Sequence, residues 1–178
     1  MSNIDIIVQN YFSLIRTPFI TEFMYLLSSL FDFSFYFLAI TFFVALLVYL
    51  VRNFRYAVLF VSTLLFGIIL VYLLKSFFNV GRPVDTVIYA FGQSFPSYHA
   101  TVATIFFSLL MYIFDDYFKG SWRVIFNIFC ITLIFLIAFS RVYLGVHWLS
   151  DVAFGILLGS LICYFSVTVF KKFTGVLE

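Results

Sequence analysis

The sequence predicts an all-α integral membrane protein, and its composition and long apolar segments are the observations that lead there. Of the 178 residues, 65% are hydrophobic and only 10% are charged, and the mean hydropathy is +1.15. A soluble domain this apolar could not cover its surface with polar groups. The 28 Phe and 12 Tyr residues suit a surface that faces lipid. The net charge of only +2 gives no sign of a nucleic-acid partner.

Five apolar segments are long enough, or nearly so, to form membrane-spanning helices, which need about 20 residues. They cover residues 33–51, 56–74, 96–114, 122–140 and 147–170. Short polar stretches, such as residues 52–55 and 115–120, separate them. Gly155 and Gly159 form a small-xxx-small pair that favours close helix packing. We expect five firm transmembrane helices in one membrane-embedded domain that covers residues 1–178.

The N-terminal segment, residues 1–31, is apolar enough for a helix, but Arg16, Pro18 and Glu22 interrupt it. Because proline starts helices more readily than it continues them, two short interfacial helices that meet near Thr17 fit better than one clean span. The segment also lacks the basic n-region of a cleavable signal peptide, so we expect the first apolar span to direct insertion.

Three short motifs carry polar groups that are hard to explain as packing in so apolar a chain. They read Lys75-x6-Arg82-Pro83, Pro96-Ser97-Tyr98-His99 and Ser140-Arg141-x5-His147-x3-Asp151. Each motif falls at an end of an expected helix, and in an antiparallel bundle all of these ends lie on the same side of the membrane. The sequence therefore predicts that the polar residues of the motifs gather at one interface.

The distribution of Lys and Arg predicts which side of the membrane this is. The motif-free side holds six cations, namely Arg52, Arg55, Lys119, Arg123, Lys171 and Lys172. The motif side holds Lys75, Arg82 and Arg141, together with Arg16 if the N-terminal segment stays there. By the positive-inside rule the motif-free side is cytoplasmic, and the motifs face the periplasm or the cell exterior.

Lys75, Arg82 and Arg141, which we call the motif cations, have no matching set of acids nearby in the sequence. Arg offers a planar fork for phosphate oxygens and Lys a point charge, and the helix start at Ser97 would add free backbone N–H groups. A single cation at a helix end is often only a snorkelling side chain. Three of them beside the only two histidines of the chain favour a phosphate cradle.

The two histidines supply a candidate nucleophile and a candidate proton donor. His147 and Asp151 are four residues apart and therefore share one helix face. A carboxylate that accepts from one ring nitrogen fixes the tautomer and leaves the other nitrogen free to attack. His99, from another helix, could protonate the leaving oxygen.

Three rival interpretations use the same residues. Ser97, His147 and Asp151 could form a serine-hydrolase triad, but the chain has no G-x-S-x-G elbow and a triad needs no set of cations. His99, His147 and Asp151 could hold a metal ion, but the motif cations would repel it. A non-enzymatic lipid-phosphate binder would need the cations but not the set of histidines and aspartate.

Together the three motifs resemble the signature of the type-2 phosphatidic acid phosphatase superfamily, which includes membrane lipid phosphatases, bacterial acid phosphatases and vanadium haloperoxidases. The likeness spans residues 75–151, under half of the chain. It implies that His147 is the nucleophile of a phosphohistidine intermediate, that Asp151 orients it, and that His99 acts first as acid and then as base. It implies no metal or other cofactor, and phosphoryl oxygens held by Lys75, Arg82, Ser97 and Arg141.

The chain departs from the superfamily pattern at Tyr98, where Pro-Ser-Gly-His is usual. The backbone N–H of Tyr98 could still bind phosphate, and we expect its side chain at the rim of the pocket with a wet hydroxyl. The membrane branch of the superfamily has a six-helix core. The resemblance therefore also implies that residues 4–31 form an N-terminal helical segment in the place of a sixth helix.

These observations lead us to expect a metal-independent lipid phosphatase that acts on a membrane lipid phosphate or pyrophosphate through a phosphohistidine. Undecaprenyl pyrophosphate is the leading substrate, because an outward-facing site suits that carrier. The alternatives are a lipid A 1-phosphate, phosphatidylglycerol phosphate or phosphatidic acid phosphatase, a lipid phosphotransferase, and a lipid-phosphate binding protein. The small size and short loops resemble bacterial members, so the expected location is the bacterial inner (cytoplasmic) membrane, with the lipid bilayer and the lipid substrate as partners.

Overall fold

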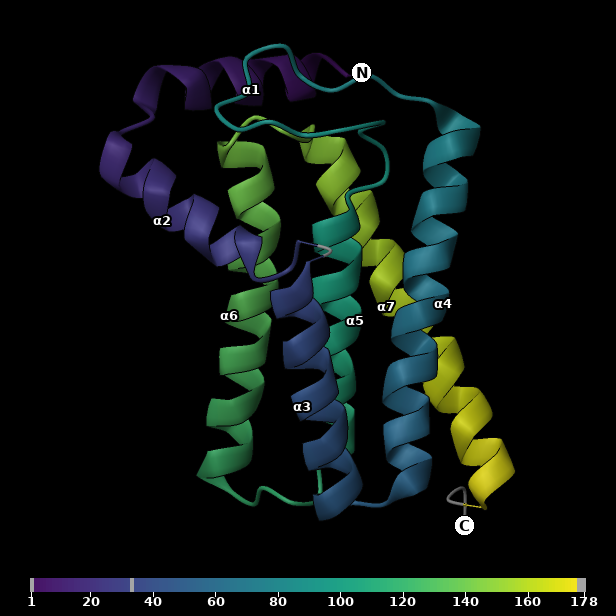
Figure 1. Ribbon diagram of the computed structural model, residues 1–178. Helices are drawn as coiled ribbons and strands as arrows, with labels where there is room; N and C mark the ends of the chain where they lie inside the picture. Colours follow the sequence, from purple (N-terminus) through teal and green to yellow (C-terminus); the bar gives the residue numbers. More distant parts are fainter. Residues whose placement is uncertain (1, 33, 176–178) are drawn as a thin grey trace.

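Seven helices and their connections form the described part of the protein, residues 2–32 and 34–175 of a computed structural model (Figure 1). The helices are α1 (Asn3–Ile15), α2 (Pro18–Ser29), α3 (Phe35–Val51), α4 (Phe54–Phe78), α5 (Tyr98–Ile113), α6 (Ser121–Tyr143) and α7 (Leu149–Thr174). Helices α3 to α7 run side by side as a bundle, while α1 lies across one end and α2 slants along α6 (Figure 1). The predicted all-α fold is confirmed for the described residues.

Three of the helices, α4, α6 and α7, are long and apolar enough to cross a membrane. Helices α3 and α5 are apolar as well, but they have only 17 and 16 residues, which is about 25 Å of helix. The hydrocarbon core of a bilayer is about 30 Å thick. Helix α5 is slightly shorter than its apolar segment, residues 96–114. It begins after its N-cap, Ser97, and ends at Ile113.

The N-terminal segment forms two helices rather than one span, as the sequence predicts. Helix α1 ends at Ile15, and Pro18 takes the first position of α2, where its missing N–H costs no hydrogen bond. The Thr17 hydroxyl caps α2 by accepting from the N–H of Ile20 at 3.4 Å. With 13 and 12 residues, neither helix is long enough to cross a bilayer.

Helix α7 packs against α5, the most buried helix of the bundle, through two glycines. A Cβ atom at Gly159 would lie 2.7 Å from the carbonyl oxygen of Thr101, and one at Gly155 would lie 2.9 Å from that of Ser97. Larger residues cannot approach so closely, so the close packing predicted for these two glycines is confirmed. It holds the start of α7 against the start of α5, where the N–H of Ser97 donates to the Asp151 carbonyl at 3.2 Å.

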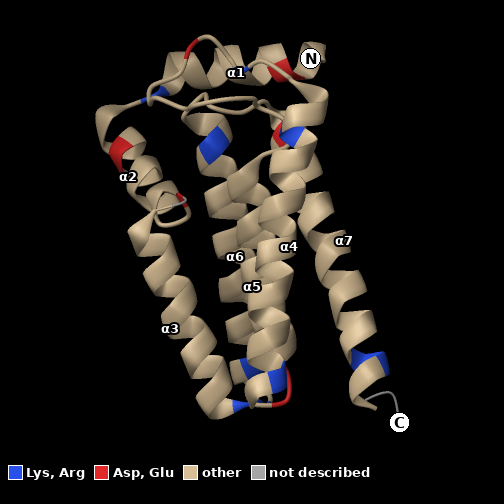
Figure 2. Ribbon diagram, turned by 45° about the vertical axis from the view of Figure 1, so that its right-hand side comes forward, with Lys and Arg blue, Asp and Glu red and all other residues tan. Residues whose placement is uncertain are grey.

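The charged residues concentrate near the two ends of the bundle (Figure 2). One end holds the α3–α4 and α5–α6 connections, and the other end holds the three motifs together with α1. The connection between α4 and α5, residues 79–97, also crosses the second end, where Asp85 forms a 2.9 Å ion pair with Arg16. The predicted gathering of the motifs at one end is confirmed.

The glycine contact generates a prediction for stability. A Gly159→Leu substitution should force α5 and α7 apart, because the added side chain meets the backbone of Thr101. Such overpacking costs about 1–3 kcal/mol, which should lower the melting temperature by several degrees in detergent. The matched control is Ser160→Leu on the exposed side of α7, which should melt like the wild type. Equal melting temperatures for the two variants would contradict the close packing.

Candidate active site

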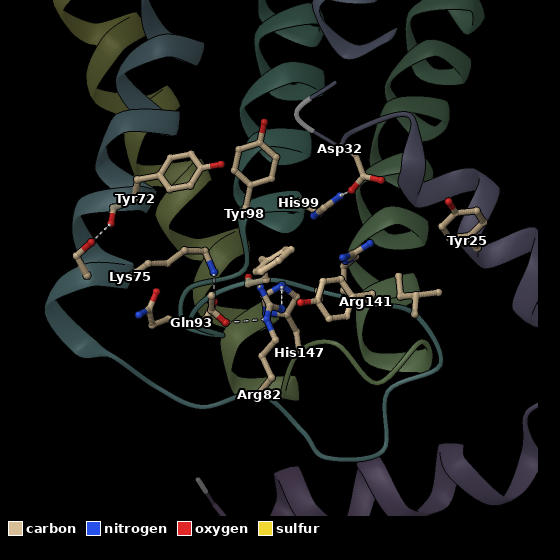
Figure 3. Close-up of a pocket in the computed structure, with 16 residues that line it drawn as sticks. Tyr25, Asp32, Tyr72, Lys75, Arg82, Gln93, Tyr98, His99, Arg141 and His147 are labelled. Atoms are coloured by element: carbon tan, nitrogen blue, oxygen red, sulfur yellow. Dashed lines mark hydrogen bonds and ion pairs between the residues drawn. The ribbon is translucent and has the colours of Figure 1, made fainter. Parts of the chain in front are cut away.

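One cavity of about 530 Å³ lies at the end of the bundle that carries the motifs (Figure 3). Sixteen residues line it, and they come from α2, the α2–α3 linker, α4, the 79–97 connection, α5, α6 and the α6–α7 turn. Among the lining residues are Lys75, Arg82, Tyr98, His99, Arg141 and His147. Six of the eight site residues predicted from the sequence therefore meet here, while Ser97 and Asp151 do not line the cavity.

Lys75 lies one turn before the end of α4 and is 8% exposed. Its Nζ donates to the backbone carbonyls of Gln93 and Ser94 at 2.6 and 3.1 Å. These neutral acceptors fix the position of the ammonium group without cancelling its charge. The charge therefore remains available to an anion in the cavity.

Arg82 is fixed in the same way by three carbonyls. Its Nε and Nη2 donate to Gly92 and Phe91 at 3.0 and 2.8 Å. Its Nη1 donates to the carbonyl of Val146 at 2.7 Å and lies 3.3 Å from Nε2 of His147. Arg82 thus joins the α4–α5 connection to the α6–α7 turn and places its charge beside a histidine.

Arg141, in the last turn of α6, is 4% exposed. Its Nη1 donates to the Ser28 hydroxyl of α2 at 2.8 Å, while its buried Nε has no partner among the residues that the structure describes. In the same part of the chain, none of the five ion pairs involves a motif cation. Buried cations without acidic partners, together with an unpaired N–H, favour a bound acceptor group such as phosphate.

His147 lies in the turn between α6 and α7 and is 1% exposed. Its Nδ1 is 3.4 Å from Oδ2 of Asp151 and 3.3 Å from the hydroxyl of Ser94. We assign the ring proton to Nδ1, because a carboxylate can only accept. Nε2 then carries the lone pair beside Arg82. The predicted contact of His147 with Asp151 is present, but the prediction that the two residues share a helix face is wrong, because His147 lies in the turn before α7 begins at Leu149.

Ser94 is a member of this site that the motifs did not reveal. It is completely buried, and its hydroxyl donates to the carboxylate of Asp151. Asp151 also accepts from the N–H of Trp148 at 2.9 Å. These two donors hold the carboxylate in place beside His147. The sequence contains no spacing signal for Ser94, because only the path of the 79–97 connection brings it there.

The surroundings of His147 keep its imidazole neutral. Burial, followed by the charges of Arg82 and Arg141, lowers the pKa of His147 well below its usual value of 6.5. The neutral ring, with its lone pair at Nε2, is the form that can attack phosphorus. The candidate nucleophile is therefore in its reactive state at neutral pH.

Figure 3 shows His99 and His147 on opposite sides of a space that is flanked by Lys75 and Arg141. Nε2 of His99 lies 2.8 Å from Oδ1 of Asp32 in the α2–α3 linker. Asp32 lies 67 positions away from His99 and belongs to none of the three motifs. Its only signal was an isolated carboxylate within an apolar stretch.

Ser97 stands at the predicted helix start, as the N-cap of α5, but it does not line the cavity. It is completely buried, and its hydroxyl caps α5 by accepting from the N–H of Ala100 at 3.5 Å. Since Ser97 does not line the cavity and its hydroxyl is occupied by this cap, its contact with phosphate stays a prediction. The serine beside His147 and Asp151 is Ser94, which lies on the Nδ1 side of the ring. The triad with Ser97 is therefore not assembled.

Tyr98 lines the cavity, but the expectation of a wet hydroxyl is wrong. The hydroxyl is buried and has no partner in the described part of the chain. The ring packs beside Tyr72, with ring centroids 6.0 Å apart. Figure 3 shows the hydroxyl pointing away from the motif cations. The aromatic packing of α4 against α5 explains this orientation.

The rival metal site is not assembled either. Within residues 2–32 and 34–175, no three His, Cys, Asp or Glu side chains form a group that could hold a metal ion. Asp151 contacts Nδ1 of His147 and does not line the cavity, whereas His99 does. The three side chains therefore do not surround one position that a metal ion could occupy.

Comparisons with known proteins agree with this site. The family model described as PAP2 superfamily matches residues 55–174. In fold, the chain is similar to a transmembrane PAP2 type phosphatidylglycerolphosphate phosphatase from Bacillus subtilis, with a TM-score of 0.85, 25% identity and coverage of 98% of this chain and 86% of the other. It is also similar to LpxE from Aquifex aeolicus, with a TM-score of 0.75, 22% identity and coverage of 92% and 94%. No curated protein sequence matches.

The matched region covers more than half of the chain, so this protein belongs to the PAP2 superfamily. It is a phosphatase of that superfamily that acts on membrane lipid phosphates. The matched region contains all three motifs. It excludes α1, α2 and the linker that carries Asp32.

The histidine environment generates a prediction that NMR can test. With only two histidines in the chain, ¹⁵N-histidine labelling in micelles gives two sets of ring signals, which a His99→Gln variant assigns. The pKa of His147 should lie clearly below 6.5. Arg82→Gln should raise it, because removing a cation stabilises the protonated ring. A midpoint for His147 at or above 6.5 in the wild type would contradict the assigned environment.

Proposed function

We propose that this protein is a metal-independent lipid phosphatase that works through a phosphohistidine at His147. One observation carries the proposal: two histidines face a space bordered by two buried cations, Lys75 and Arg141, and the half-buried Arg82, none of which has an acidic partner in the described residues. Binding alone would need the cations. It would not need a histidine whose tautomer is fixed by Asp151 and Ser94.

In the first step of the proposed reaction, the motif cations hold the phosphoryl oxygens and stabilise the charge of the transition state. Nε2 of His147 forms a bond to phosphorus as the bond to the leaving oxygen breaks, and His99 gives that oxygen a proton. Asp151 accepts from Nδ1–H and so stabilises the charge that develops on the ring.

In the second step, His99 takes a proton from water as the water oxygen attacks phosphorus. The bond between phosphorus and Nε2 breaks, which returns the lone pair to His147 and releases inorganic phosphate. A phosphotransferase would follow the same first step and use an acceptor hydroxyl in place of water.

For the substrate, we infer a glycerophospholipid phosphomonoester of the phosphatidylglycerol phosphate type. The support is the 0.85 TM-score and 98% coverage against the Bacillus subtilis enzyme, whose described substrate is phosphatidylglycerolphosphate. The likeness to LpxE, at 22% identity, supports the fold alone. Undecaprenyl pyrophosphate, the leading substrate from the sequence, has no comparable support and becomes an alternative together with lipid A 1-phosphate and phosphatidic acid.

The test is phosphate release by the purified protein from a panel of these lipids, with and without a chelator. The wild type should release phosphate fastest from phosphatidylglycerol phosphate, with unchanged rates in the chelator and competitive inhibition by vanadate. His147→Ala should lower turnover by at least about 10³-fold, because a covalent nucleophile is lost. His99→Ala should lower it by about 10²–10⁴-fold.

With radiolabelled p-nitrophenyl phosphate, whose leaving group departs without a proton, an acid-labile phosphoenzyme should accumulate in His99→Ala and be absent from His147→Ala. Wild-type rates in His147→Ala would refute the phosphohistidine. Activity that vanishes with the chelator and returns with zinc or magnesium would favour a metal enzyme. Fastest release from undecaprenyl pyrophosphate would restore the substrate that the sequence favoured.

We further propose that α3 to α7 all cross the bacterial inner membrane, with α1 at its outer surface. The six cations at the far end of the bundle, set against the motif cations, support a cytoplasmic far end and a site that faces the periplasm or cell exterior. The shorter α3 and α5 lie parallel to three full-length helices (Figure 1). Local thinning of the bilayer can accommodate such helices at modest cost.

The orientation can be tested by labelling single cysteines in intact cells. The native Cys130 and Cys163 are buried and can be replaced by Ala to remove background. A Val84→Cys variant, at a fully exposed position of the 79–97 connection, should react with an impermeant thiol reagent. A Lys119→Cys variant at the opposite end should react only after lysis. The reverse labelling pattern would exclude an outward-facing site.

A further inference from the structure

The acid–base histidine of the proposed reaction is tied to a part of the chain that lies outside the family match. Oδ1 of Asp32, in the linker between α2 and α3, is 2.8 Å from Nε2 of His99. The side chain of His99 is 8% exposed and that of Asp32 is 48% exposed. Both residues line the cavity, so the contact forms part of the cavity wall and is not a distant surface pair.

The position of Asp32 is fixed by its neighbours in the linker and in α2. Phe31 is 5% exposed, and its ring packs against Phe106 and Phe107 of α5 with centroids 5.6 and 5.7 Å apart. One turn earlier, Ser28 accepts the 2.8 Å hydrogen bond from Arg141. The end of α2 and its linker therefore contact a phosphate-binding cation and the acid–base histidine at the same time.

The charges around His99 explain why a carboxylate is needed there. Arg141 from α6 and Arg82 from the 79–97 connection face His99 with positive charge, and His147 is its uncharged neighbour across the cavity. Both cations disfavour a second proton on the His99 ring. Within the described residues, Asp32 is the one carboxylate in ion-pair contact with His99.

Asp32 is suited to remain ionised at this position. Burial alone would raise the pKa of Asp32, but the hydrogen bond to His99 and the charges of His99 and Arg141 outweigh it and lower that pKa. An ionised carboxylate that accepts from Nε2–H holds one proton on that nitrogen, and its negative charge stabilises the doubly protonated ring, in which Nδ1 carries the second proton. Nδ1 has no hydrogen-bond partner in the part of the chain that the structure describes, which leaves it open to a ligand in the cavity.

We propose that Asp32 is the positioning residue of the acid–base histidine, and that it orients His99 so that Nδ1 delivers the proton to the leaving oxygen. This inference rests on the proposed function. As the bond between phosphorus and the leaving oxygen breaks, that oxygen keeps the electron pair and takes the Nδ1 proton. His99 is left neutral with its remaining proton on Nε2, shared with Asp32. Water later returns a proton to Nδ1 as it attacks the phosphohistidine.

The test uses the dependence of rate on the leaving group. A nitrophenolate departs without a proton, whereas an alkoxide needs one. We therefore compare kcat/KM for p-nitrophenyl phosphate and for dodecyl phosphate in the same detergent, with wild type and Asp32→Asn. Asp32→Asn should lower kcat/KM by about 10–10²-fold with dodecyl phosphate and by less than about 3-fold with p-nitrophenyl phosphate. His99→Ala should show the same selectivity.

The matched control is Asp116→Asn, which removes a carboxylate that pairs with Arg52 at the opposite end of the bundle. It should leave both rates unchanged. The double variant Asp32→Asn/His99→Ala should be no slower than His99→Ala with dodecyl phosphate, because Asp32 acts through His99. Additive losses would overturn the inference.

A merely structural role for Asp32 predicts equal losses with both substrates, together with a lower melting temperature, and that outcome also overturns the inference. If Asp32→Asn does not fold, the same two rates are measured with Asp32→Glu, which keeps the charge on a longer side chain. A loss confined to dodecyl phosphate then supports the proposal, and equal losses refute it. These outcomes differ from a failure of the proposed function, in which His147→Ala would retain activity.

Discussion

The placement of two buried cations and one half-buried cation at one end of an apolar bundle is the constraint on which the rest of the site depends. Removing a charge from water is costly unless other polar groups replace the hydration shell. Lys75 and Arg82 meet this cost with backbone carbonyls of residues 91–94 and 146. Carbonyls orient the cations without neutralising them. The positive potential therefore remains to be satisfied by a ligand, and phosphate has the charge and the oxygens to do so.

The same constraint explains the behaviour of the two histidines. Burial and the charges of the motif cations lower the pKa of His147, which suits a nucleophile, and two of the same cations, Arg141 and Arg82, face His99, where a proton is needed. The protein separates the two by where it places carboxylates. Asp151 and Ser94 hold the ring of His147 from behind, whereas Asp32 contacts His99 at the wall of the cavity. Two imidazoles in one positive field can thus take different roles.

The N-terminal helices brace this arrangement from outside the family match. Asp5 of α1 is 2% exposed and accepts from the backbone N–H and the hydroxyl of Ser150 at 2.9 and 3.0 Å, beside Asp151. Arg16 is paired with Asp85 and donates to the carbonyl of Tyr143 at 2.8 Å. These contacts hold α1 and Arg16 against the α6–α7 turn and the residues that flank it. There Gly145, at φ +74°, leaves no room for a Cβ atom between Asp85 and Arg16.

The sequence by itself determined the membrane class, the break between α1 and α2, the close approach at Gly155 and Gly159, and the gathering of the motifs at one end. These features follow from local rules: apolar length, proline chemistry, residue size and the alternation of an antiparallel bundle. Six of the eight predicted site residues line the cavity for the same reason. In an antiparallel bundle, helix ends on one side of the membrane lie close to one another.

Only the tertiary structure decided the contacts between segments that are distant in the sequence. Ser94 is 57 positions from Asp151, and Asp32 is 67 positions from His99. Neither serine nor aspartate has a local pattern that marks such a partnership. The places of Ser97 and Tyr98 were also set by packing, because α5 is surrounded by its neighbours and its first turn must satisfy its own cap. Motif spacing fixes which residues share a helix face, whereas the path of the 79–97 connection and of the α2–α3 linker depends on how the whole bundle packs.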